Sequence, residues 1–322
     1  MTRTLPLLIA GLLALARLGA QDETIFNHYV QNPIILNPAA AGFDDSYRAS
    51  LNARAQWSGF EDSPKTVALR VNGPVGESFG IGASLFSESA AQLTRLKGQL
   101  DVAFRFQFGR KVKDVAPFRA AFGFFTLFQR LNVDGSVLAN AQQDLGDDNL
   151  MAFVNGENQF DAGVGFYGTY QERIFGGLTI NNLVSNRLEN ISGNTSGSNT
   201  INYTLLLGQR FRVEELNVNL TPSVMLRNVV DAPFMMDFNL QAGFLDDQFI
   251  AGLSYRYLGA MGLLLGTEFS GLQLYYSYDL GFGGFQQYNN GSHEFTVGYT
   301  LSRGDIRERR RRKVAQEREQ RR

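Results

Sequence analysis

The chain has 322 residues and a formal net charge of −1, with no cysteine and two histidines. The lack of cysteine excludes disulfides, thiolate metal sites and thiol nucleophiles, and two histidines are too few for a histidine-based metal cluster. A mean hydropathy of −0.16 excludes a bundle of membrane helices. The 34 Gly, 26 Phe and 12 Tyr against only eight Pro favour strands and tight turns.

The small net charge hides an uneven distribution along the chain. The last 20 residues contain ten basic and four acidic residues, whereas residues 21–302 contain 18 basic and 27 acidic residues. We therefore divide the chain into an acidic body and a basic tail at 303–322.

Residues 1–20 have the pattern of a secretory signal peptide. Arg3 precedes the apolar run Leu5–Leu18, and the small residues Gly19 and Ala20 follow it. This order predicts cleavage after Ala20 and export of the body. The alternative is an uncleaved anchor helix, but the run is shorter than the roughly 20 residues that a helix needs to cross a bilayer.

Residues 21–46 contain two Asn-Pro pairs, Asn32-Pro33 and Asn37-Pro38, in an otherwise apolar stretch. Each proline removes an amide donor and biases the preceding asparagine away from helix. We therefore expect an irregular segment that tucks against the periplasmic end of a barrel or into its lumen.

The body, residues 47–302, repeats a pattern with a period of two. In Gln99–Phe108, one parity is entirely Leu, Val and Phe, and the other carries Asp101, Arg105 and polar or small residues. A strand sends alternate side chains to opposite faces, so each such segment has one apolar and one polar face. About fourteen strands are predicted, at 47–57, 65–72, 79–86, 99–108, 118–131, 159–171, 175–181, 202–212, 216–227, 234–244, 249–257, 261–269, 272–282 and 293–302.

Many such strands in succession predict an all-β fold, an antiparallel up-and-down transmembrane β-barrel in the outer membrane. An Arg or Lys that faces lipid at mid-bilayer costs about 2–4 kcal/mol, so the charged side chains of the strands must point inward. We expect a lumen cross-linked by ion pairs and hydrogen bonds. The residues assigned to this lumen charge network are Arg54, Arg70, Asp101, Arg105, Asp161, Arg227, Asp237, Arg256, Glu268 and Asp279.

The connections between the predicted strands separate into two groups. The two longest, 132–158 and 183–200, both follow odd-numbered strands, whereas most turns after even-numbered strands are short. Outer-membrane barrels have short periplasmic turns and longer extracellular loops. This arrangement predicts that both termini are periplasmic.

No catalytic constellation is found, and no cofactor is expected, so we predict that the chain is not an enzyme. His293 begins the last strand on the lipid-side parity, where a structural or interfacial role is favoured. Acidic residues of the first long loop are read as solvated acids rather than as a site for a hard cation: Asp144, Asp147, Asp148 and Glu157. Several aromatic residues are assigned to interfacial girdles, with a sugar-binding platform as the alternative: Tyr47, Trp57, Tyr275, Tyr276 and Tyr278.

The basic tail permits two interpretations, which stay open. It is either a solvated tail or a periplasmic arm that binds an acidic partner or an anionic cell-wall polymer. Nucleic acid is not an expected ligand for an exported chain. The residues of the candidate arm are Arg307, Arg309, Arg310, Arg311, Arg312 and Lys313.

The stretch from Gln21 to Thr66 resembles the PorP/SprF family of outer-membrane proteins from Bacteroidetes. The final strand, His293–Leu301, is similar to the His-Glu closing strand of that family, and the basic tail is a departure from it. The residues that carry the resemblance are Tyr29, Asn32, Pro33, Asn37, Pro38, Gly42, Arg54, Gln56, Trp57, Gly59, Pro64 and Thr66.

The resemblance implies a part in the type IX secretion and gliding machinery. Such proteins help to secrete large adhesins and other cargo, or to hold them at the cell surface, and some are linked to a periplasmic complex that contacts peptidoglycan. We therefore expect lipid, a secreted cargo at the extracellular rim and periplasmic secretion-system or peptidoglycan-binding subunits as partners. The alternative is an outer-membrane transport channel for small solutes, and an outer-membrane enzyme that depends on His293 is a third hypothesis. The identity of the cargo, the loops that bind it and whether the lumen is plugged are left open.

Overall fold

The computed structural model describes residues 26–60, 62–110, 116–134, 156–184, 201–229, 232–257, 259–282 and 290–304. Fifteen strands form one antiparallel sheet in these ranges, together with three short 3₁₀ turns. No helix among the described residues is long and apolar enough to cross a membrane. The 3₁₀ turns are η1 (Pro33–Ile35), η2 (Pro38–Ala40) and η3 (Glu214–Leu216). The strands are β1 (Ser46–Ala55), β2 (Lys65–Val75), β3 (Phe79–Ala90), β4 (Leu93–Phe108), β5 (Phe118–Val133), β6 (Glu157–Tyr170), β7 (Ile174–Asn181), β8 (Asn202–Gln209), β9 (Phe211–Val213), β10 (Val218–Asn228), β11 (Met235–Phe244), β12 (Phe249–Arg256), β13 (Ala260–Phe269), β14 (Leu272–Gly281) and β15 (Ser292–Ser302).

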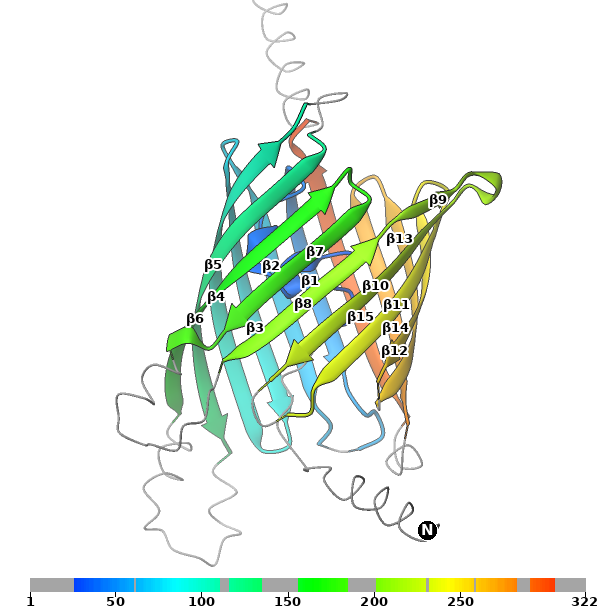
Figure 1. Cartoon of the computed structure of the whole chain (residues 1–322). Helices are drawn as coiled ribbons and strands as arrows, with labels where there is room; N and C mark the ends of the chain where they lie inside the picture. Colours follow the sequence, from blue (N-terminus) through cyan, green and yellow to red (C-terminus); the bar gives the residue numbers. More distant parts are fainter. Residues whose placement is uncertain are drawn as a thin grey trace, which may run out of the picture.

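The sheet closes on itself into a barrel (Figure 1). Each strand pairs with its neighbours in the sequence, except that β8 and the short β9 both pair with β10, and the last strand, β15, pairs with β1 from Ser46 opposite Ser302 to Ala55 opposite His293. Apart from β9, which pairs with β10 alone, closure leaves no free edge in the described sheet, so the backbone amides and carbonyls of the strands are paired around the ring.

Strands β8 and β9 are one crossing of the wall with an interruption. Both pair with β10 in a continuous register, with Gly208 opposite Ser223 and Phe211 opposite Leu220. Pro222 of β10 lies at the break, and proline has no amide hydrogen to contribute to the ladder. The barrel therefore has fourteen crossings, which confirms the number predicted from the alternating pattern.

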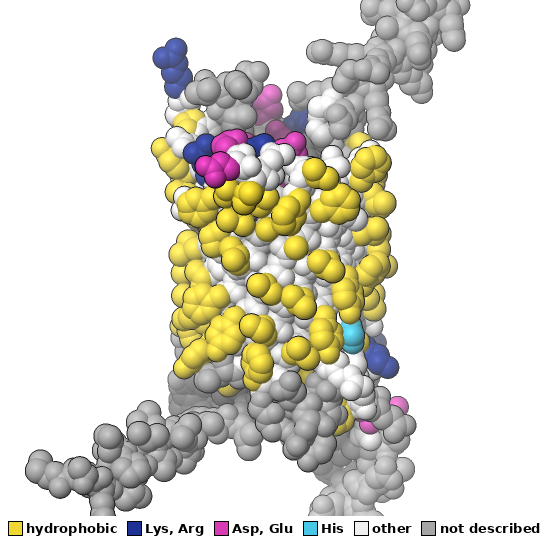
Figure 2. All heavy atoms as spheres, turned by 90° about the vertical axis from the view of Figure 1, so that its right-hand side faces the viewer, with side chains coloured by type: hydrophobic (Ala, Val, Ile, Leu, Met, Phe, Trp, Pro, Cys, Tyr) yellow, Lys and Arg dark blue, Asp and Glu magenta, His cyan; other side chains and the backbone are white. Residues whose placement is uncertain are grey.

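The outer surface of the barrel is apolar and the inner wall is polar. Leu100 on β4 is 63% exposed and points outward, whereas its neighbour Asp101 is 1% exposed and points inward. Figure 2 shows hydrophobic side chains in a broad band over one face of the wall, with charged side chains beyond its ends, most of them at the upper one. This band is the surface that acyl chains contact in an outer-membrane barrel.

The two rims differ in the length of their connections. The short-turn rim carries the turns after β2, β6, β11 and β13, and β1 begins and β15 ends there. The long-loop rim carries the connections of β5 to β6 and β7 to β8, at the lower end in Figure 1. The two groups of connections thus lie on opposite rims, as the sequence predicted.

Strands β3 to β5 differ from the prediction at the long-loop rim. Strand β4 begins at Leu93 rather than at Gln99, and β3 continues to Ala90. Strand β5, which is apolar on both parities, exposes Phe122 and Phe124 to the outside and buries Phe125 inside. At the ends of β3 and β4, strand pairing continues beyond the residues that follow the alternating apolar pattern. At β5, apolar residues fill the lumen, so both faces of the strand are apolar.

We predict that Leu100→Arg lowers the free energy of unfolding by about 2–4 kcal/mol, since it places a cation against acyl chains. The measurement is urea unfolding in lipid vesicles, followed by the fluorescence of the single tryptophan, Trp57. The control is Leu216→Arg, at an exposed turn on the short-turn rim, for which the expected cost is about 0–1 kcal/mol. Equal effects of the two substitutions would contradict the lipid-facing assignment.

Candidate functional site

Residues 26–45, here called the lumenal segment, cross the interior of the barrel. Asn27 contacts Asp279 and Ser277 on β14, in the half of the barrel nearer the long-loop rim. At the other end, the carbonyl of Asp45 accepts a hydrogen bond from the amide of Arg303 at the short-turn rim. The blue turns η1 and η2 lie inside the barrel in Figure 1. The interior is thus occupied by the chain's own N-terminal residues.

The two Asn-Pro pairs produce the two turns of this segment. Pro33 and Pro38 each occupy the first position of a 3₁₀ turn, where the missing amide hydrogen costs nothing. The side chain of Asn37 accepts a hydrogen bond from the amide of Ala39 and so caps η2. The prolines therefore fold the segment into compact turns.

A row of glycines on the inner wall makes room for the segment. A Cβ atom on Gly80 of β3 would lie 1.9 Å from the carbonyl oxygen of Ala41, and one on Gly123 of β5 would lie 2.3 Å from the amide nitrogen of Ala39. Gly165 of β6 faces the side chain of Asn37 in the same way, at 2.1 Å. No larger residue fits at these positions, so the wall is shaped to the backbone of the segment.

Hydrogen bonds attach the segment to the wall on the same side. The amide group of Asn37 donates to the carbonyl oxygens of Phe166 (2.8 Å) and Leu178 (3.3 Å), and the hydroxyl of Thr179 donates to the carbonyl of Leu36 (2.8 Å). Two cavities beside the segment, near Tyr167, have volumes of about 10 Å³ each. This is about the space that one water molecule needs, so the packing here is tight.

The other end of the segment enters a buried ionic network, here called the Asn27 cluster: Asn27, His28, Arg54, Asp237, Arg256, Asp279 and Glu294. The side-chain amide of Asn27 donates to both carboxylate oxygens of Asp279, at 2.8 and 2.7 Å, and its backbone amide donates to Glu294 at 2.7 Å. Its side-chain oxygen accepts from Arg256 at 3.2 Å. One residue of the segment thus contacts strands β12, β14 and β15.

Arg54 joins the two carboxylates that Asn27 contacts. Its guanidinium donates to Asp279 at 2.7 Å and to Glu294 at 3.0 Å, and Arg256 donates to Asp237 at 3.1 Å. The side chains of Arg54 and Glu294 are at most 2% exposed. Charges that are buried in this way must be paired, because an unpaired buried charge costs several kcal/mol. The cluster therefore holds the segment and the wall as one unit.

His28 and Glu294 are the ionisable members of the cluster that the predicted network lacked, and Asn27 is a third, uncharged one. The Nδ1 atom of His28 lies 3.2 Å from Glu294 and 2.6 Å from the hydroxyl of Thr296. The sequence did contain a signal for Glu294, because the residue lies on the polar parity of the last strand. Closure of the barrel places Glu294 directly opposite Arg54 in the pairing of β15 with β1.

The ten residues of the predicted charge network lie in several separate parts of the lumen. Arg54, Asp237, Arg256 and Asp279 belong to the Asn27 cluster. Arg105 donates to the carbonyl of Gly42 at 2.6 Å and to Asp45 at 2.9 Å, near the short-turn rim.

The other members lie away from the cluster. Glu268 accepts a hydrogen bond from Tyr275. Asp161 accepts from the amides of Ala162 and Val184 at 2.7 and 3.0 Å. Four members line or lie beside a cavity described below: Arg70, Asp101, Asp161 and Arg227.

The residues that carry the family resemblance fall in the lumenal segment and the first hairpin. Tyr29 is buried against Leu206 and Met225, and the side-chain amide of Asn32 donates to the hydroxyl of Ser50 at 3.1 Å. In the hairpin from β1 to β2, the amide of Gln56 donates to the carbonyl of Pro64 at 2.8 Å. The remaining residues shape the turns or pack near them: Pro33, Asn37, Pro38, Gly42, Arg54, Trp57, Gly59 and Thr66.

One aromatic assignment is wrong. Tyr275 is 3% exposed and lies in the lumen beside His28, because it stands on the inward parity of β14. Tyr276 and Tyr278 do face outward, where the hydroxyl of Tyr276 lies 2.8 Å from Nδ1 of His293. Among the described residues, no group of His, Asp and Glu could hold a metal ion.

Several predictions concern residues outside the described ranges. These are the signal peptide, the acids Asp144, Asp147 and Asp148, and the tail beyond Gly304 with its basic residues. The expectation that both termini are periplasmic also stays a prediction. The described chain begins at Phe26 in the long-loop half of the lumen and ends at Gly304 on the short-turn rim.

Comparison with known proteins gives one family. A family model described as "Type IX secretion system membrane protein PorP/SprF" matches residues 18–299. No curated protein matches the chain. Among solved structures, the chain is similar to the "CymD monoaromatic hydrocarbon channel", with 13% identity, a TM-score of 0.51 and coverage of 87% of this chain and 94% of that one. It is also similar to the toluene transporter TbuX of Ralstonia pickettii, with 9% identity, a TM-score of 0.48 and coverage of 89% and 96%. At 13% identity, the similarity to CymD shows a shared barrel fold and nothing more.

We predict that Gly123→Val displaces the lumenal segment, because its side chain would overlap the backbone of Ala39. The chain has no cysteine, so a single Ala39→Cys substitution provides a reporter at a fully buried position. Its thiol should resist maleimide in the otherwise unchanged protein and react when Gly123→Val is added. The control is Gly98→Val on β4, where a Cβ meets only Leu85 at 3.7 Å. Protection that persists with valine at 123 would argue against the fitted groove.

We predict that Arg54→Met destabilises the barrel by about 3–5 kcal/mol, since it leaves Asp279 and Glu294 buried without their shared cation. Urea unfolding in detergent micelles measures the change. The control is Arg95→Met, which removes a partly exposed pair with Glu88 and should cost about 0–1 kcal/mol. A loss at Arg54 no larger than that at Arg95 would show that the cluster does not hold the segment.

Proposed function

The chain belongs to the PorP/SprF family of type IX secretion system membrane proteins, and on this basis we propose that it is a non-enzymatic outer-membrane component that helps to secrete or anchor a large surface protein. The observation that carries the proposal is the lumenal segment. A barrel whose interior is occupied by its own residues offers its rims and outer wall to partners rather than an open channel.

The proposal assigns one class of partner to each rim. The long-loop rim faces outward and holds the secreted cargo, an adhesin of gliding motility or another cargo of the system. The short-turn rim faces the periplasm and contacts secretion-system or peptidoglycan-binding subunits. What supports this assignment is the usual asymmetry of outer-membrane barrels, in which long loops are extracellular and short turns periplasmic.

The basic tail adds a second periplasmic contact in this proposal. Strand β15 ends at Ser302 on the short-turn rim, and the ten basic residues of 303–322 follow. A cationic arm in that place would attract an acidic subunit or an anionic cell-wall polymer over about one Debye length, roughly 8 Å at physiological ionic strength.

The alternative is an outer-membrane channel for small solutes. It is favoured by a cavity of about 130 Å³ that the lumenal segment leaves on its long-loop side. The similar barrels CymD and TbuX are described as a monoaromatic hydrocarbon channel and a toluene transporter, and transport by this chain would extend that use of the fold. The tight packing of the segment against β5–β8 favours secretion over transport.

We expect the purified full chain to carry no large steady current in planar bilayers, because the segment occupies the lumen. Deletion of residues 26–42 should raise the conductance, and Gly123→Val provides a second variant that keeps the Asn27 cluster. A large steady current through the unaltered protein would support the channel instead.

The secretion role itself is tested in the source bacterium. Removal of the gene should release a large secreted protein from the cell surface or prevent its export, and a tagged copy should recover that protein from solubilised outer membranes. An unchanged surface proteome would overturn the proposed function.

A further inference from the structure

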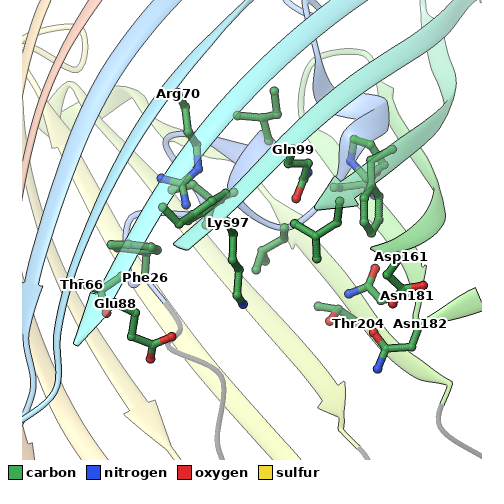
Figure 3. Close-up of a pocket in the computed structure, with 18 of the residues that line it drawn as sticks. Phe26, Thr66, Arg70, Glu88, Lys97, Gln99, Asp161, Asn181, Asn182 and Thr204 are labelled. Atoms are coloured by element: carbon green, nitrogen blue, oxygen red, sulfur yellow. The ribbon is translucent and has the colours of Figure 1, made fainter. Parts of the chain in front are cut away.

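A cavity of the lumen lies between the lumenal segment and the long-loop half of the wall (Figure 3). Its volume is about 130 Å³. The segment supplies one wall through Ile34, Ile35 and Leu36, and Phe125 and Leu127 of β5 supply part of another. Around this apolar lining stand four basic and two acidic side chains: Arg70, Arg95, Lys97, Arg227, Glu88 and Asp161.

Arg70 differs from Arg54, the buried arginine of the Asn27 cluster, in its partners. Its side chain is 1% exposed, yet no carboxylate of the described residues lies within 4 Å of its guanidinium. Arg54, by contrast, contacts two carboxylates, Asp279 and Glu294. The Nε atoms of both arginines have no hydrogen-bond partner among these residues, whereas the Nη1 atom of Arg70 donates to the neutral side chain of Asn52 at 2.8 Å.

Two aromatic rings hold the guanidinium of Arg70 in place at the cavity. Its central carbon lies 4.8 Å from the ring centre of Phe26 and 4.6 Å from that of Phe86. Cation–π contacts of this kind orient a guanidinium and partly offset the cost of its burial, but they do not neutralise its charge. Phe26 and Phe86 also line the cavity, so a fixed cation and apolar surface meet at one place.

The acidic side chains that line the cavity have partners other than Arg70. Glu88 is engaged by Arg95 at 3.2 Å, and Asp161 accepts hydrogen bonds from two backbone amides. The carboxylates that act electrostatically on Arg70 are those of Glu294 and Asp101, and neither forms an ion pair with it within 4 Å. A planar guanidinium pairs best with a planar carboxylate, which it can bind through two parallel hydrogen bonds.

We propose that this cavity is a binding site for a carboxylate carried on a small apolar group, with Arg70 as the counter-ion and the lumenal segment as its apolar wall. The size agrees, because in another protein an apolar cavity of roughly 150 Å³ holds a benzene ring. The ligand is either a small apolar organic acid or the apolar C-terminal residue of a polypeptide, which share this chemistry. The inference does not depend on the proposed function, since binding of such an acid is measured without any secretion partner.

The experiment uses the full chain in detergent micelles and two pairs of probes, with binding followed by calorimetry or ligand-observed NMR. Benzoate and benzamide represent the small acid and its neutral counterpart, and N-acetyl-leucine and N-acetyl-leucinamide represent the C-terminal residue. We expect at least one acid to bind at least tenfold more tightly than its amide. Preference for benzoate indicates the small acid, and preference for N-acetyl-leucine indicates the polypeptide terminus.

Two variants separate binding at this site from binding elsewhere. Arg70→Gln should weaken binding of the acid at least tenfold and leave binding of the amide nearly unchanged. Leu127→Trp fills the cavity from the opposite wall without altering Arg70 and should abolish binding of both. Its control is Leu100→Trp, on the lipid-facing side of β4, which should bind like the unaltered protein.

A check of folding accompanies each variant, because Arg70 is buried. The folded barrel should keep its heat-dependent migration on gels, and Leu127→Trp carries the test if Arg70→Gln does not fold. The proposal is overturned if neither acid binds at millimolar concentration, or if the folded Leu127→Trp protein binds the acid as tightly as Leu100→Trp does.

Discussion

The structure depends on the pairing of Arg54 with Asp279 and Glu294 inside a closed ring of strands. The lipid outside forces charged side chains of the strands inward, and the interior offers little water to solvate them. Each charge must then find a partner across the lumen. Arg54 on β1 meets Glu294 on β15, so the same contact also joins the first and last strands of the barrel. The side chain and amide of Asn27 complete the contacts of these carboxylates and tie the lumenal segment to the wall.

The lumenal segment occupies the interior of the barrel. Pro33 and Pro38 each begin a compact turn of the segment. On the facing wall, Gly80, Gly123 and Gly165 have no side chain and so leave room for it. The small residues of the wall and the compact turns of the segment are complementary in shape, so each feature explains the presence of the other.

The lumenal segment fills the interior of the barrel unevenly. On the side of β5–β8 the segment and the wall leave spaces of about 10 Å³, whereas towards the long-loop rim a cavity of about 130 Å³ remains beside Arg70. A buried guanidinium between two phenyl rings, with no carboxylate within 4 Å, is a costly arrangement. It contrasts with the Asn27 cluster, where Arg54 pairs directly with two carboxylates.

The sequence by itself determined most of the wall: the fourteen crossings, the face that meets lipid in every strand except β5, and the separation of long from short connections. A strand places residues on its two faces with a period of two, and a charge on the wrong face is costly, so neighbours such as Leu100 and Asp101 reveal their sides locally. The tertiary structure alone decided which inward residues meet. His28 and Glu294 are 266 positions apart, and Gly123 faces Ala39 across the lumen. These contacts depend on how the ring closes and how the segment passes through it, and alternation along one strand contains no information on either.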